Sequence, residues 1–447
     1  MSMPPQNIQP SRDIGGRRGS PNNRPALFID CSISAVGDNV SGIPRVVRQL
    51  VTHLRETPAD EVFFSCQPVA VGAGKYRIHQ LRQPVQLPSP FARGLRTAAR
   101  RCDEWLREWA PGLERAIVQS VMAAGGIPSL GLAQAGPSAG TPEADMQPGD
   151  VLLLADAMWI VPRWKDGVMH AKSRGAKIVA LIYDLIPITN PGFFAPMFCA
   201  QFETWVQEML PLADAFVCIS HATAADLRRF AEHRRAESHG PVGVFPLGTR
   251  FSLNGPMQTS RMTQVLEKSP KPVLMVGTIE PRKNHALVLD AFERLWQEGS
   301  SLPLVVIGRR GWLCEQTLKR FARLHKQGRP VVHVADATDD DLKHAYRHAR
   351  CLIFPSIAEG FGLPIVEALA QGLPAIASDI PVHREVGGDL ATYIPLGDPG
   401  RLAALLQSIA DGSTVLTAPA PGTVHLPTWA ESAAALQAEI DRLLASR

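Results

Sequence analysis

The stretch EGFGLPIVE holds two glutamates, Glu359 and Glu367, with two glycines, a phenylalanine and a proline among the residues between them. It follows the apolar run CLIFP, which predicts a buried strand, and its second half begins a helical pattern with Pro364 in the first turn. Glu359 is therefore expected in the loop at the carboxyl end of the strand, and Glu367 one turn into the helix. Carboxylates accept hydrogen bonds from hydroxyl groups, so this arrangement suits a ligand with vicinal hydroxyls at both of its ends.

A basic pair, Arg282 and Lys283, occurs in the segment VGTIEPRKNH. The pair falls between the predicted strand PVLMVG and a helical pattern whose start Asn284 is predicted to cap. Two cations beside the free N–H groups of a helix start form a site for phosphate oxygens. A basic pair in such a loop is by itself more often solvated surface, but with the two glutamates it predicts a site for a sugar joined to a ribose through a diphosphate.

Both segments belong to a series of short apolar runs that alternate with helical patterns. The runs of the first series are ALFID, VLLLAD, KIVALIYD, AFVCIS and GVFPLG, and those of the second are PVLMVG, LPLVVIG, PVVHVAD, CLIFP and PAIASD. Strands that are apolar on both faces and separated by helices are typical of parallel sheets covered on both sides. The sequence therefore predicts an α/β protein with two doubly wound, Rossmann-like domains in tandem, and ligands at the carboxyl ends of the strands.

The predicted domain boundaries follow shifts in composition along the chain. Residues 1–24 are polar and rich in Pro, Gly and Arg, and we expect a disordered tail. A first Rossmann-like domain is predicted over 25–255, with a helical and linker insertion at about 91–147. A second is predicted over 256–425, and residues 426–447 are predicted to form a helix that returns to the first domain.

The segment FARGLRTAARRCDEWLREW, within residues 91–126, predicts an amphipathic helix whose arginines lie largely away from its apolar face. Two interpretations remain open: the helix docks on its own domain and exposes a solvated basic face, or it lies on an anionic membrane surface. No apolar run approaches the roughly 18–20 residues that a membrane span requires.

Composition excludes several classes of protein. The 447 residues are 45% apolar and 20% charged with a net charge of +4, which is ordinary for a globular protein and gives no argument for a nucleic-acid partner. The seven cysteines are dispersed without a CxxC pair, which favours buried, reduced thiols. The N-terminus has no hydrophobic stretch typical of a secretion signal, so a cytoplasmic location is expected.

The segment PSIAEGFGLPIVEALAQGLPAIASD resembles the E-x7-E signature region of the retaining glycosyltransferases of family 4. These enzymes have the GT-B fold, in which two Rossmann-like domains face each other across a cleft. The resemblance extends through most of residues 26–447. It includes VGTIEPRKN and HREVGGDLATYIPLGDP in the second half, and is looser at SGIPRVVRQL, YDLIPI and CISHATAADL in the first half. The signature is specific for the family and poorly specific for the sugar.

The resemblance implies roles for individual residues of the second domain. Glu359 would contact hydroxyls of the transferred sugar, Glu367 would bind the nucleotide ribose, and Lys283 would contact the diphosphate. Many family members carry an arginine where this chain has Thr278, and Arg282 is expected to supply that charge. The backbone lining the sugar and phosphate would run through Gly360, Phe361, Gly362 and Leu363.

In the first domain the resemblance implies a glycine-containing loop over the donor phosphates, with Gly42, Ser41 and Ile43 near the β-phosphate. Asp184 of YDLIPI would approach the sugar. Relatives often carry a histidine directly before this position, but Tyr183 stands there, so no histidine-based role is expected.

The reaction that the resemblance implies is retaining transfer without a covalent intermediate. The leaving diphosphate would be stabilised by Lys283 and Arg282, with Glu359 and Asp184 completing the catalytic set. No Asp-x-Asp triplet falls at a predicted strand end, so we expect transfer without a metal ion or another cofactor.

The strand-end pattern YDLIPI, with SGIPRVVR and GRRGW, most resembles mannosyltransferases of bacterial polysaccharide assembly. This resemblance implies GDP-mannose as the donor and an oligosaccharide linked to polyprenyl diphosphate as the acceptor. The enzyme would then work in the cytoplasm at the inner face of the cytoplasmic membrane, in peripheral contact with it. Alternatives are a glucosyl-, rhamnosyl- or N-acetylglucosaminyltransferase of the same fold, a nucleotide-sugar epimerase, or a catalytically silent carbohydrate-binding or scaffold protein. A dinucleotide oxidoreductase is disfavoured because no GxGxxG follows any predicted strand.

Overall fold

The computed structural model describes residues 25–34, 42–54, 63–68, 76–79, 144–161, 163–235, 240–249, 262, 266 and 270–446. The predicted tail at 1–24, the amphipathic segment at 91–126 and Ser41 lie outside the described residues. The chain divides into two compact units, Met1–Val179 and Ala180–Arg447.

Every apolar run of the first predicted series forms a strand. The first sheet consists of β1 (Leu27–Asp30), β2 (Phe63–Pro68), β3 (Tyr76–His79), β4 (Val151–Leu154), β5 (Lys177–Ile182), β6 (Ala215–Cys218) and β7 (Val242–Val244). The sheet has the order β3-β2-β1-β4-β5-β6-β7. β1 pairs in parallel with β2 and with β4, and Leu27 lies opposite Val151. The prediction missed β2 and β3, and β3 runs antiparallel to β2.

Amphipathic helices accompany these strands. They are α1 (Ile43–Leu54), α4 (Trp164–Ser173), α5 (Ile186–Thr189), α6 (Pro196–Met209) and α7 (His221–His233). In α1 the buried residues Val47, Leu50 and Leu54 recur at helical spacing, which is why this segment forms a helix with one apolar face. Ser220 caps α7 because its hydroxyl accepts a hydrogen bond from the Thr223 N–H.

The C-terminal helix α15 (Trp429–Ala445) packs against β6 and β7. Its start is fixed by a capping box in which Thr428 and Glu431 bond to each other's backbone N–H. Farther along, the Ser432 hydroxyl donates to the Pro246 carbonyl at 2.7 Å, and the Glu439 carboxylate accepts from the Val244 N–H at 3.2 Å.

The second series of apolar runs forms a six-stranded sheet. Its strands are β8 (Val273–Val276), β9 (Leu304–Ile307), β10 (Val331–Val334), β11 (Cys351–Phe354), β12 (Ala375–Ser378) and β13 (Ala391–Ile394). All pair in parallel in the order β10-β9-β8-β11-β12-β13. Numbered from its first strand this is 3-2-1-4-5-6, the order of a Rossmann sheet. β13 escaped prediction because Ala391, Thr392 and Tyr393 are only partly buried at the sheet edge, so no continuous apolar run marks it.

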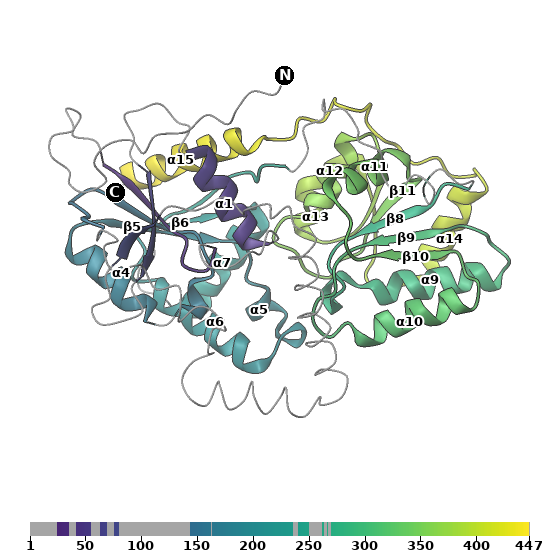
Figure 1. Ribbon diagram of the computed structural model, residues 1–447, viewed down its shortest axis with the longest axis horizontal. Coiled ribbons are helices and arrows are strands. Elements are labelled where there is room, and N and C mark those ends of the chain that lie inside the picture. The colour runs from purple at the N-terminus through teal and green to yellow at the C-terminus, as the bar shows by residue number, and fades with distance from the viewer. Residues whose placement is uncertain are drawn as a thin grey trace, which may run out of the picture. The chain divides into compact units, whose positions relative to one another are not determined.

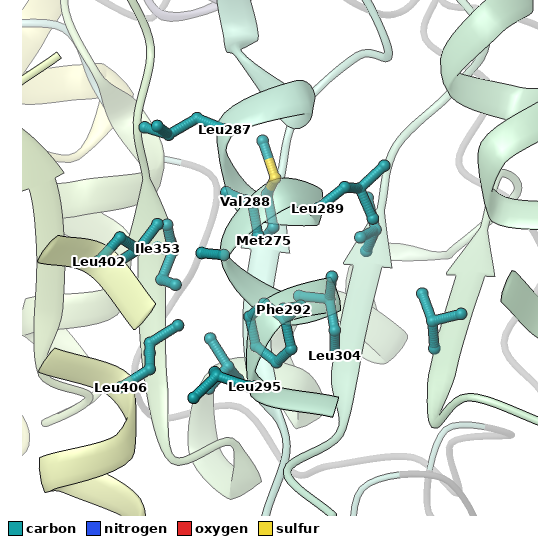
Figure 2. Close-up of a cluster of buried hydrophobic side chains, with 14 of the residues drawn as sticks. Met275, Leu287, Val288, Leu289, Phe292, Leu295, Leu304, Ile353, Leu402 and Leu406 are labelled. Atoms are coloured by element: carbon teal, nitrogen blue, oxygen red, sulfur yellow. The ribbon is translucent and has the colours of Figure 1, made fainter. Parts of the chain in front are cut away.

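Helices cover both faces of this sheet (Figure 1). One face carries α9 (His285–Gln297), α10 (Glu315–Lys326) and α14 (Pro399–Ala410), and the other carries α11 (Asp339–His348), α12 (Leu363–Ala370) and α13 (Pro381–Gly387). Successive residues of β8 alternate between two cores: Met275 packs with α9 and α14, whereas Leu274 packs with α11 and α12. Figure 2 shows the first core, with Phe292 of α9 near its centre and Leu402 of α14 next to Ile353 of β11. Burying a side chain of this size stabilises the fold by about 1.5–3 kcal/mol.

The cysteines whose side chains are described, Cys31, Cys199, Cys218, Cys314 and Cys351, are buried free thiols, as the sequence predicts. Across the described ranges, the structure contains no helix long and apolar enough to cross a membrane.

Candidate active site

The residues of the E-x7-E segment and the basic pair meet at the carboxyl ends of two neighbouring central strands. β8 and β11 pair directly, with Cys351 opposite Val273. They are the strands between which the order of the sheet reverses, so the chain leaves them toward opposite sides. Such a switch point leaves a crevice at the strand ends, which is the usual ligand site of an open α/β sheet.

The loop after β8 presents the basic pair. A 3-10 turn at Pro281–Lys283 carries Arg282 and Lys283 and leads into α9. The Arg282 carbonyl accepts from the Ile357 N–H at 2.8 Å, which joins this loop to the one after β11. Asn284 stands at the helix start, but its backbone is left-handed with a φ of 57° and its side chain makes no capping bond. The predicted cap at Asn284 is therefore wrong, because the turn that presents the cations fixes a different geometry.

Two glycines let the strand ends approach closely. A Cβ on Gly308, after β9, would lie 1.8 Å from the Gly277 carbonyl oxygen, so only glycine fits there. Gly277 itself has a φ of 153°, and a Cβ at that position would contact the Lys283 side chain. The stem of Lys283 thus lies directly against the end of β8.

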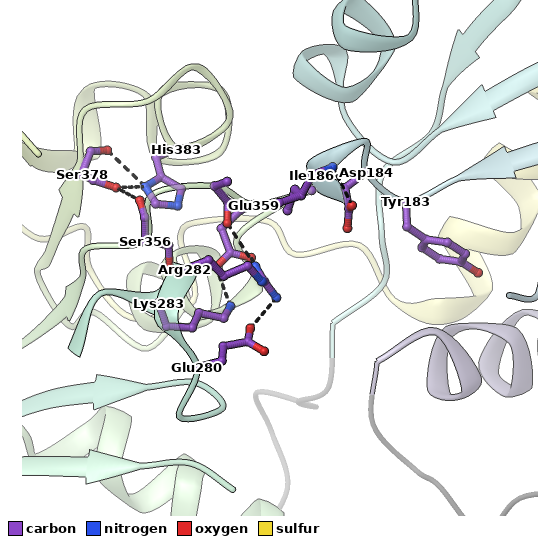
Figure 3. A network of polar contacts seen from close by, with 12 residues as sticks. Tyr183, Asp184, Ile186, Glu280, Arg282, Lys283, Ser356, Glu359, Ser378 and His383 are labelled. Carbon is purple, nitrogen blue, oxygen red and sulfur yellow. Dashed lines mark hydrogen bonds and ion pairs between the residues drawn. The ribbon is translucent and has the colours of Figure 1, made fainter. Parts of the chain in front are cut away.

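Glu359 lies between the two cations (Figure 3). Arg282 Nη1 donates to Glu359 Oε2 at 2.7 Å and to the Ala358 carbonyl at 3.0 Å. Lys283 Nζ donates to the other oxygen of Glu359 and stands 4.9 Å from the centre of the Phe354 ring. The Glu359 side chain is 8% exposed, so these ion pairs are largely shielded from water.

Glu280 completes the cluster, and sequence reasoning missed it. Its carboxylate pairs with Arg282 Nη2 at 2.8 Å, so the guanidinium is held by Glu280 and Glu359. The signal that could have identified it is an acid two positions before the basic pair, in the same loop after β8. Together the four side chains bring two cations and two carboxyl groups to one strand edge.

The cluster shifts the pKa values of its two glutamates in opposite directions. Burial on its own raises the pKa of the Glu359 carboxyl, but Lys283 and Arg282 outweigh it and lower the pKa to about 2. Burial raises the pKa of Glu280, and Arg282 only partly offsets this effect. Burial likewise lowers the pKa of Lys283, with Glu359 opposing. At neutral pH Glu359 is therefore an ionised, acceptor-only group, as contact with sugar hydroxyls requires.

The loop from Glu359 leads into α12 as predicted. Gly362 has a φ of 113° and precedes the first helical residue, Leu363, and Pro364 lies in the first turn. Gly360 and Gly362 are buried, whereas the side chains of Phe361 and Leu363 are partly buried. The backbone predicted to line sugar and phosphate is thus a tight turn directly between Glu359 and the helix start.

Glu367 lies inside α12, where it is 4% exposed. Tyr346, a fully buried residue of α11, donates its hydroxyl hydrogen to Glu367 Oε2 at 2.9 Å. Sequence reasoning missed Tyr346, because a tyrosine on the apolar face of a helix usually belongs to the core.

Asp184 lies against the turn that follows Glu359, because a Cβ on Gly360 would lie 3.3 Å from the Asp184 Cβ. Asp184 follows β5, and its carboxylate accepts from the Ile186 N–H at 3.0 Å (Figure 3). Burial raises the pKa of Asp184, and Arg282 partly opposes that shift. Gly42 and Ile43 belong to the first unit, where Gly42 has a φ of 64° and directly precedes α1.

The first unit has a carboxylate cluster of its own at the ends of β1 and β4. Asp156 accepts hydrogen bonds from the N–H groups of Ile33 at 3.0 Å and Ser34 at 2.6 Å. Asp30 accepts from the Ser32 N–H at 3.0 Å. Both acids are fully buried and hold the turn after β1.

Among the described side chains, no group of three or more His, Cys, Asp or Glu residues has a geometry that could hold a metal ion.

Residues 257–414 match the family model of the glycosyl transferases group 1. The matched region contains the whole six-stranded sheet and both loops of the candidate site. The likeness in sequence is therefore concentrated where the chemistry-bearing residues meet.

Two curated relatives are mannosyltransferases of Escherichia coli. The chain is 30% identical over 298 residues to the serotype-specific mannosyltransferase WbdA, a match that covers 64% of this chain and 36% of that protein. It is 27% identical over 269 residues to the O-antigen chain mannosyltransferase B, covering 57% of this chain and 68% of the relative. The chain thus spans about a third of the length of WbdA.

The fold is shared with HepE of Anabaena, whose crystal structure contains UDP and glucose. The TM-score is 0.52 and the sequence identity 16%, over 95% of this chain and 98% of that chain. Such a likeness shows the fold alone, and it confirms the predicted pair of Rossmann-like, doubly wound domains of the GT-B type. The chain thus has the GT-B fold and is similar in sequence to the group 1 glycosyl transferases.

Proposed function

We propose that the protein is a retaining glycosyltransferase that transfers a hexose. The hexose is mannose, the donor is GDP-mannose, and the acceptor is an oligosaccharide carried on polyprenyl diphosphate. The observation that carries this proposal is the buried Glu359 carboxylate held between Arg282 and Lys283 at the switch point of a Rossmann sheet. A donor of this kind presents sugar hydroxyl groups next to a diphosphate. In the cluster, Glu359 can accept hydrogen bonds from the hydroxyls, and Arg282 and Lys283 can bind the diphosphate.

The two cations would stabilise the leaving diphosphate. Their N–H groups are directed at the oxygens of Glu359, so anionic oxygen atoms already fit these positions. Diphosphate oxygens would compete for the same N–H groups when the donor binds, and the Glu359 carboxylate would then turn to the sugar hydroxyls. Fixed charges in a site shielded from water stabilise developing negative charge strongly and need little reorganisation as the bond breaks.

Retention of configuration follows if the acceptor hydroxyl attacks the face of the sugar from which the diphosphate departs. Arg282 and Lys283 supply the positive charge that a divalent cation would otherwise supply to the diphosphate, so transfer is expected to proceed without a metal. Asp184, Gly42 and Ile43 would contribute from the first sheet, as the family resemblance implies. Glu367, steadied by Tyr346, would bind the ribose.

The choice of mannose is supported by the two mannosyltransferase relatives. The second relative acts on the O-antigen chain, which also favours a role in the assembly of a bacterial polysaccharide such as an exopolysaccharide. A polyprenyl-linked acceptor would bring the enzyme to the inner face of the cytoplasmic membrane as a peripheral protein.

A binding panel tests the donor. GDP-mannose, UDP-glucose, UDP-N-acetylglucosamine, GDP and UDP are titrated calorimetrically into the wild-type protein and into Glu367→Ala. Selective binding of GDP and GDP-mannose, weakened in the variant, supports the proposal. Preference for a UDP-sugar would change the donor and keep the reaction class, whereas binding of none of the five would favour the silent-scaffold alternative.

A turnover assay tests the reaction. With donor and a polyprenyl-linked oligosaccharide, NMR of the product should show the anomeric configuration of the donor, at the same rate in EDTA and in magnesium. An inverted product or a dependence on metal would contradict the mechanism. Epimerised sugar formed from the donor alone would identify the epimerase alternative.

A further inference from the structure

A fully buried histidine of α13, His383, lies beside the candidate site. Its ring nitrogen Nδ1 lies 3.0 Å from the Ser378 hydroxyl oxygen and 3.1 Å from the Ser378 carbonyl oxygen. The Ser378 hydroxyl in turn donates its hydrogen to the Ser356 carbonyl. Ser356 follows β11 and Ser378 ends β12, so the ring is fixed by two strand ends of the second sheet (Figure 3).

These contacts determine which nitrogen carries the proton. A carbonyl oxygen only accepts, and the Ser378 hydroxyl hydrogen is already committed to Ser356, so both oxygens near Nδ1 are acceptors. Nδ1 must therefore be the protonated nitrogen. Burial lowers the pKa of His383 to about 4, so the ring is neutral at pH 7 and Nε2 is left as an acceptor.

Nε2 is buried and has no hydrogen-bond partner among the described residues. A buried acceptor without a donor destabilises the fold and is rare in native proteins unless a ligand or water supplies the missing hydrogen. The adjacent ring carbon Cδ2 would lie 3.5 Å from a Cβ on Gly362, so this edge of the ring faces the donor-binding turn. Figure 3 shows Nε2 on the side away from Ser378, toward Glu359 and Lys283.

We propose that His383 Nε2 accepts a hydrogen bond from a hydroxyl group of the donor's sugar and so contributes to sugar specificity. This inference rests on the proposed function. Phosphate oxygens are acceptors and cannot satisfy another acceptor, so the partner must be an O–H or N–H group. Among the parts of a nucleotide sugar, the sugar supplies such groups next to Glu359. Glu359 and His383 would then both accept hydrogen bonds from hydroxyl groups of the same sugar.

The key variant is His383→Asn. The asparagine amide reaches the position of Nδ1 and can still donate to Ser378, whereas nothing occupies the position of Nε2. The variant therefore removes the proposed ligand contact and keeps the contact that holds α13. His383→Gln, which extends an amide toward the Nε2 position and can present its carbonyl oxygen there, is the rescue variant. Thermal unfolding of each protein verifies that it is folded.

Calorimetric titration with GDP-mannose and with GDP separates the sugar from the nucleotide. For His383→Asn we expect binding of GDP-mannose to weaken about five- to tenfold, as for loss of one hydrogen bond, and GDP binding to stay unchanged. His383→Gln should recover part of the loss. Analogues of GDP-mannose lacking one hydroxyl each then identify the partner, because removing that hydroxyl should have no further effect in His383→Asn.

Two results would overturn the inference while leaving the proposed function intact. Equal weakening of GDP and GDP-mannose would make His383 a residue that supports the turn or the phosphates. Unchanged affinity for GDP-mannose would mean that Nε2 faces no ligand hydroxyl. If the wild-type protein bound none of the nucleotide sugars of the panel, the proposed function and this inference would fail together.

Discussion

Both sheets carry buried carboxylates at the ends of two paired central strands, yet the partners of these acids differ. At β1 and β4, Asp30 and Asp156 accept hydrogen bonds from backbone N–H groups of the turn at 32–34. At β8 and β11, Glu359 instead faces Arg282 and Lys283. The acids of both sheets thus lie at strand ends, and the two clusters differ in whether backbone N–H groups or side-chain cations contact the carboxylates.

The partners change what each acid can do. Burial dominates at Asp156 and raises the pKa of that carboxyl despite its backbone hydrogen bonds. At Glu359 the two cations outweigh burial and lower the pKa to about 2. Backbone amides are fixed by the fold, so the role of Asp156 is to stabilise a turn. Side-chain cations can exchange one anionic partner for another, so the second cluster can admit a ligand.

The largest expected effect follows from Glu359→Gln. The amide keeps the shape of the side chain, but it places an N–H group toward a cation and weakens acceptance from sugar hydroxyls. We expect transfer activity, measured as kcat/KM for the donor, to fall by about a hundred- to a thousandfold, the range for loss of one site contact in the transition state. Glu298→Gln, at the exposed end of α9, is the matched control. Activity within threefold of wild type would contradict the assignment of the cluster.

A smaller effect, on stability and not on donor affinity, is expected for Asp156→Asn. The new amide group would face backbone N–H groups and leave at least one buried donor unpaired, which costs about 1–3 kcal/mol of unfolding free energy. Urea denaturation measures this loss. Asp145→Asn, which alters an exposed ion pair with Arg174, should change stability by less than about 1 kcal/mol. If folded Asp156→Asn lost donor binding, the first cluster would have a role in binding and not only in stabilising the turn after β1.

The contributions of Glu359 and Asp156 to the free energy of unfolding should change in opposite directions as the pH falls. The pKa of Glu359 is lowered in the folded state, so its contribution is complete above its usual value of 4.5 and is lost as the pH falls toward about 2. The pKa of Asp156 is raised, so its contribution is complete below its usual 3.8 and is lost as the pH rises through the folded value.

Urea unfolding of the wild type and both variants between pH 2 and pH 7 measures these opposite trends. The advantage of wild type over Glu359→Gln should shrink below pH 4.5. Its advantage over Asp156→Asn should grow toward low pH. Parallel curves for all three proteins would mean that neither carboxyl group has a different pKa in the folded and unfolded states.

Much of the scaffold was predictable because strong, local patterns encode it. The ten apolar runs formed strands, and a capping box at Thr338 begins α11. Strands β2, β3 and β13 were missed. The residues of β13 are only partly buried, so periodicity there is weak. Sequence reasoning works where one principle, burial of an apolar face, dominates.

Within the site, the sequence predicted the acids and the cations but not what holds them. Glu359, Arg282 and Lys283 were found because each is a charged residue at a strand end. Glu280 and His383 were missed because their roles depend on partners brought close by the sheet and not by neighbours in sequence. Ser378, which orients His383, looked like an ordinary strand-end residue. Such supporting contacts follow from three-dimensional packing, which a single sequence does not display.

The smallest expected effect concerns Tyr346→Phe on α11. Phenylalanine fills the same buried space and removes the hydroxyl that donates to Glu367 Oε2. If Glu367 binds the ribose, its carboxylate should become less well oriented, and GDP affinity should weaken about threefold, with a stability loss of about 1 kcal/mol. Thr338→Ala is the matched control, because loss of the cap weakens the same helix by a similar amount without touching Glu367. Calorimetric titration with GDP compares the two variants: equal affinities would show that helix stability, and not the tyrosine hydroxyl, controls nucleotide binding.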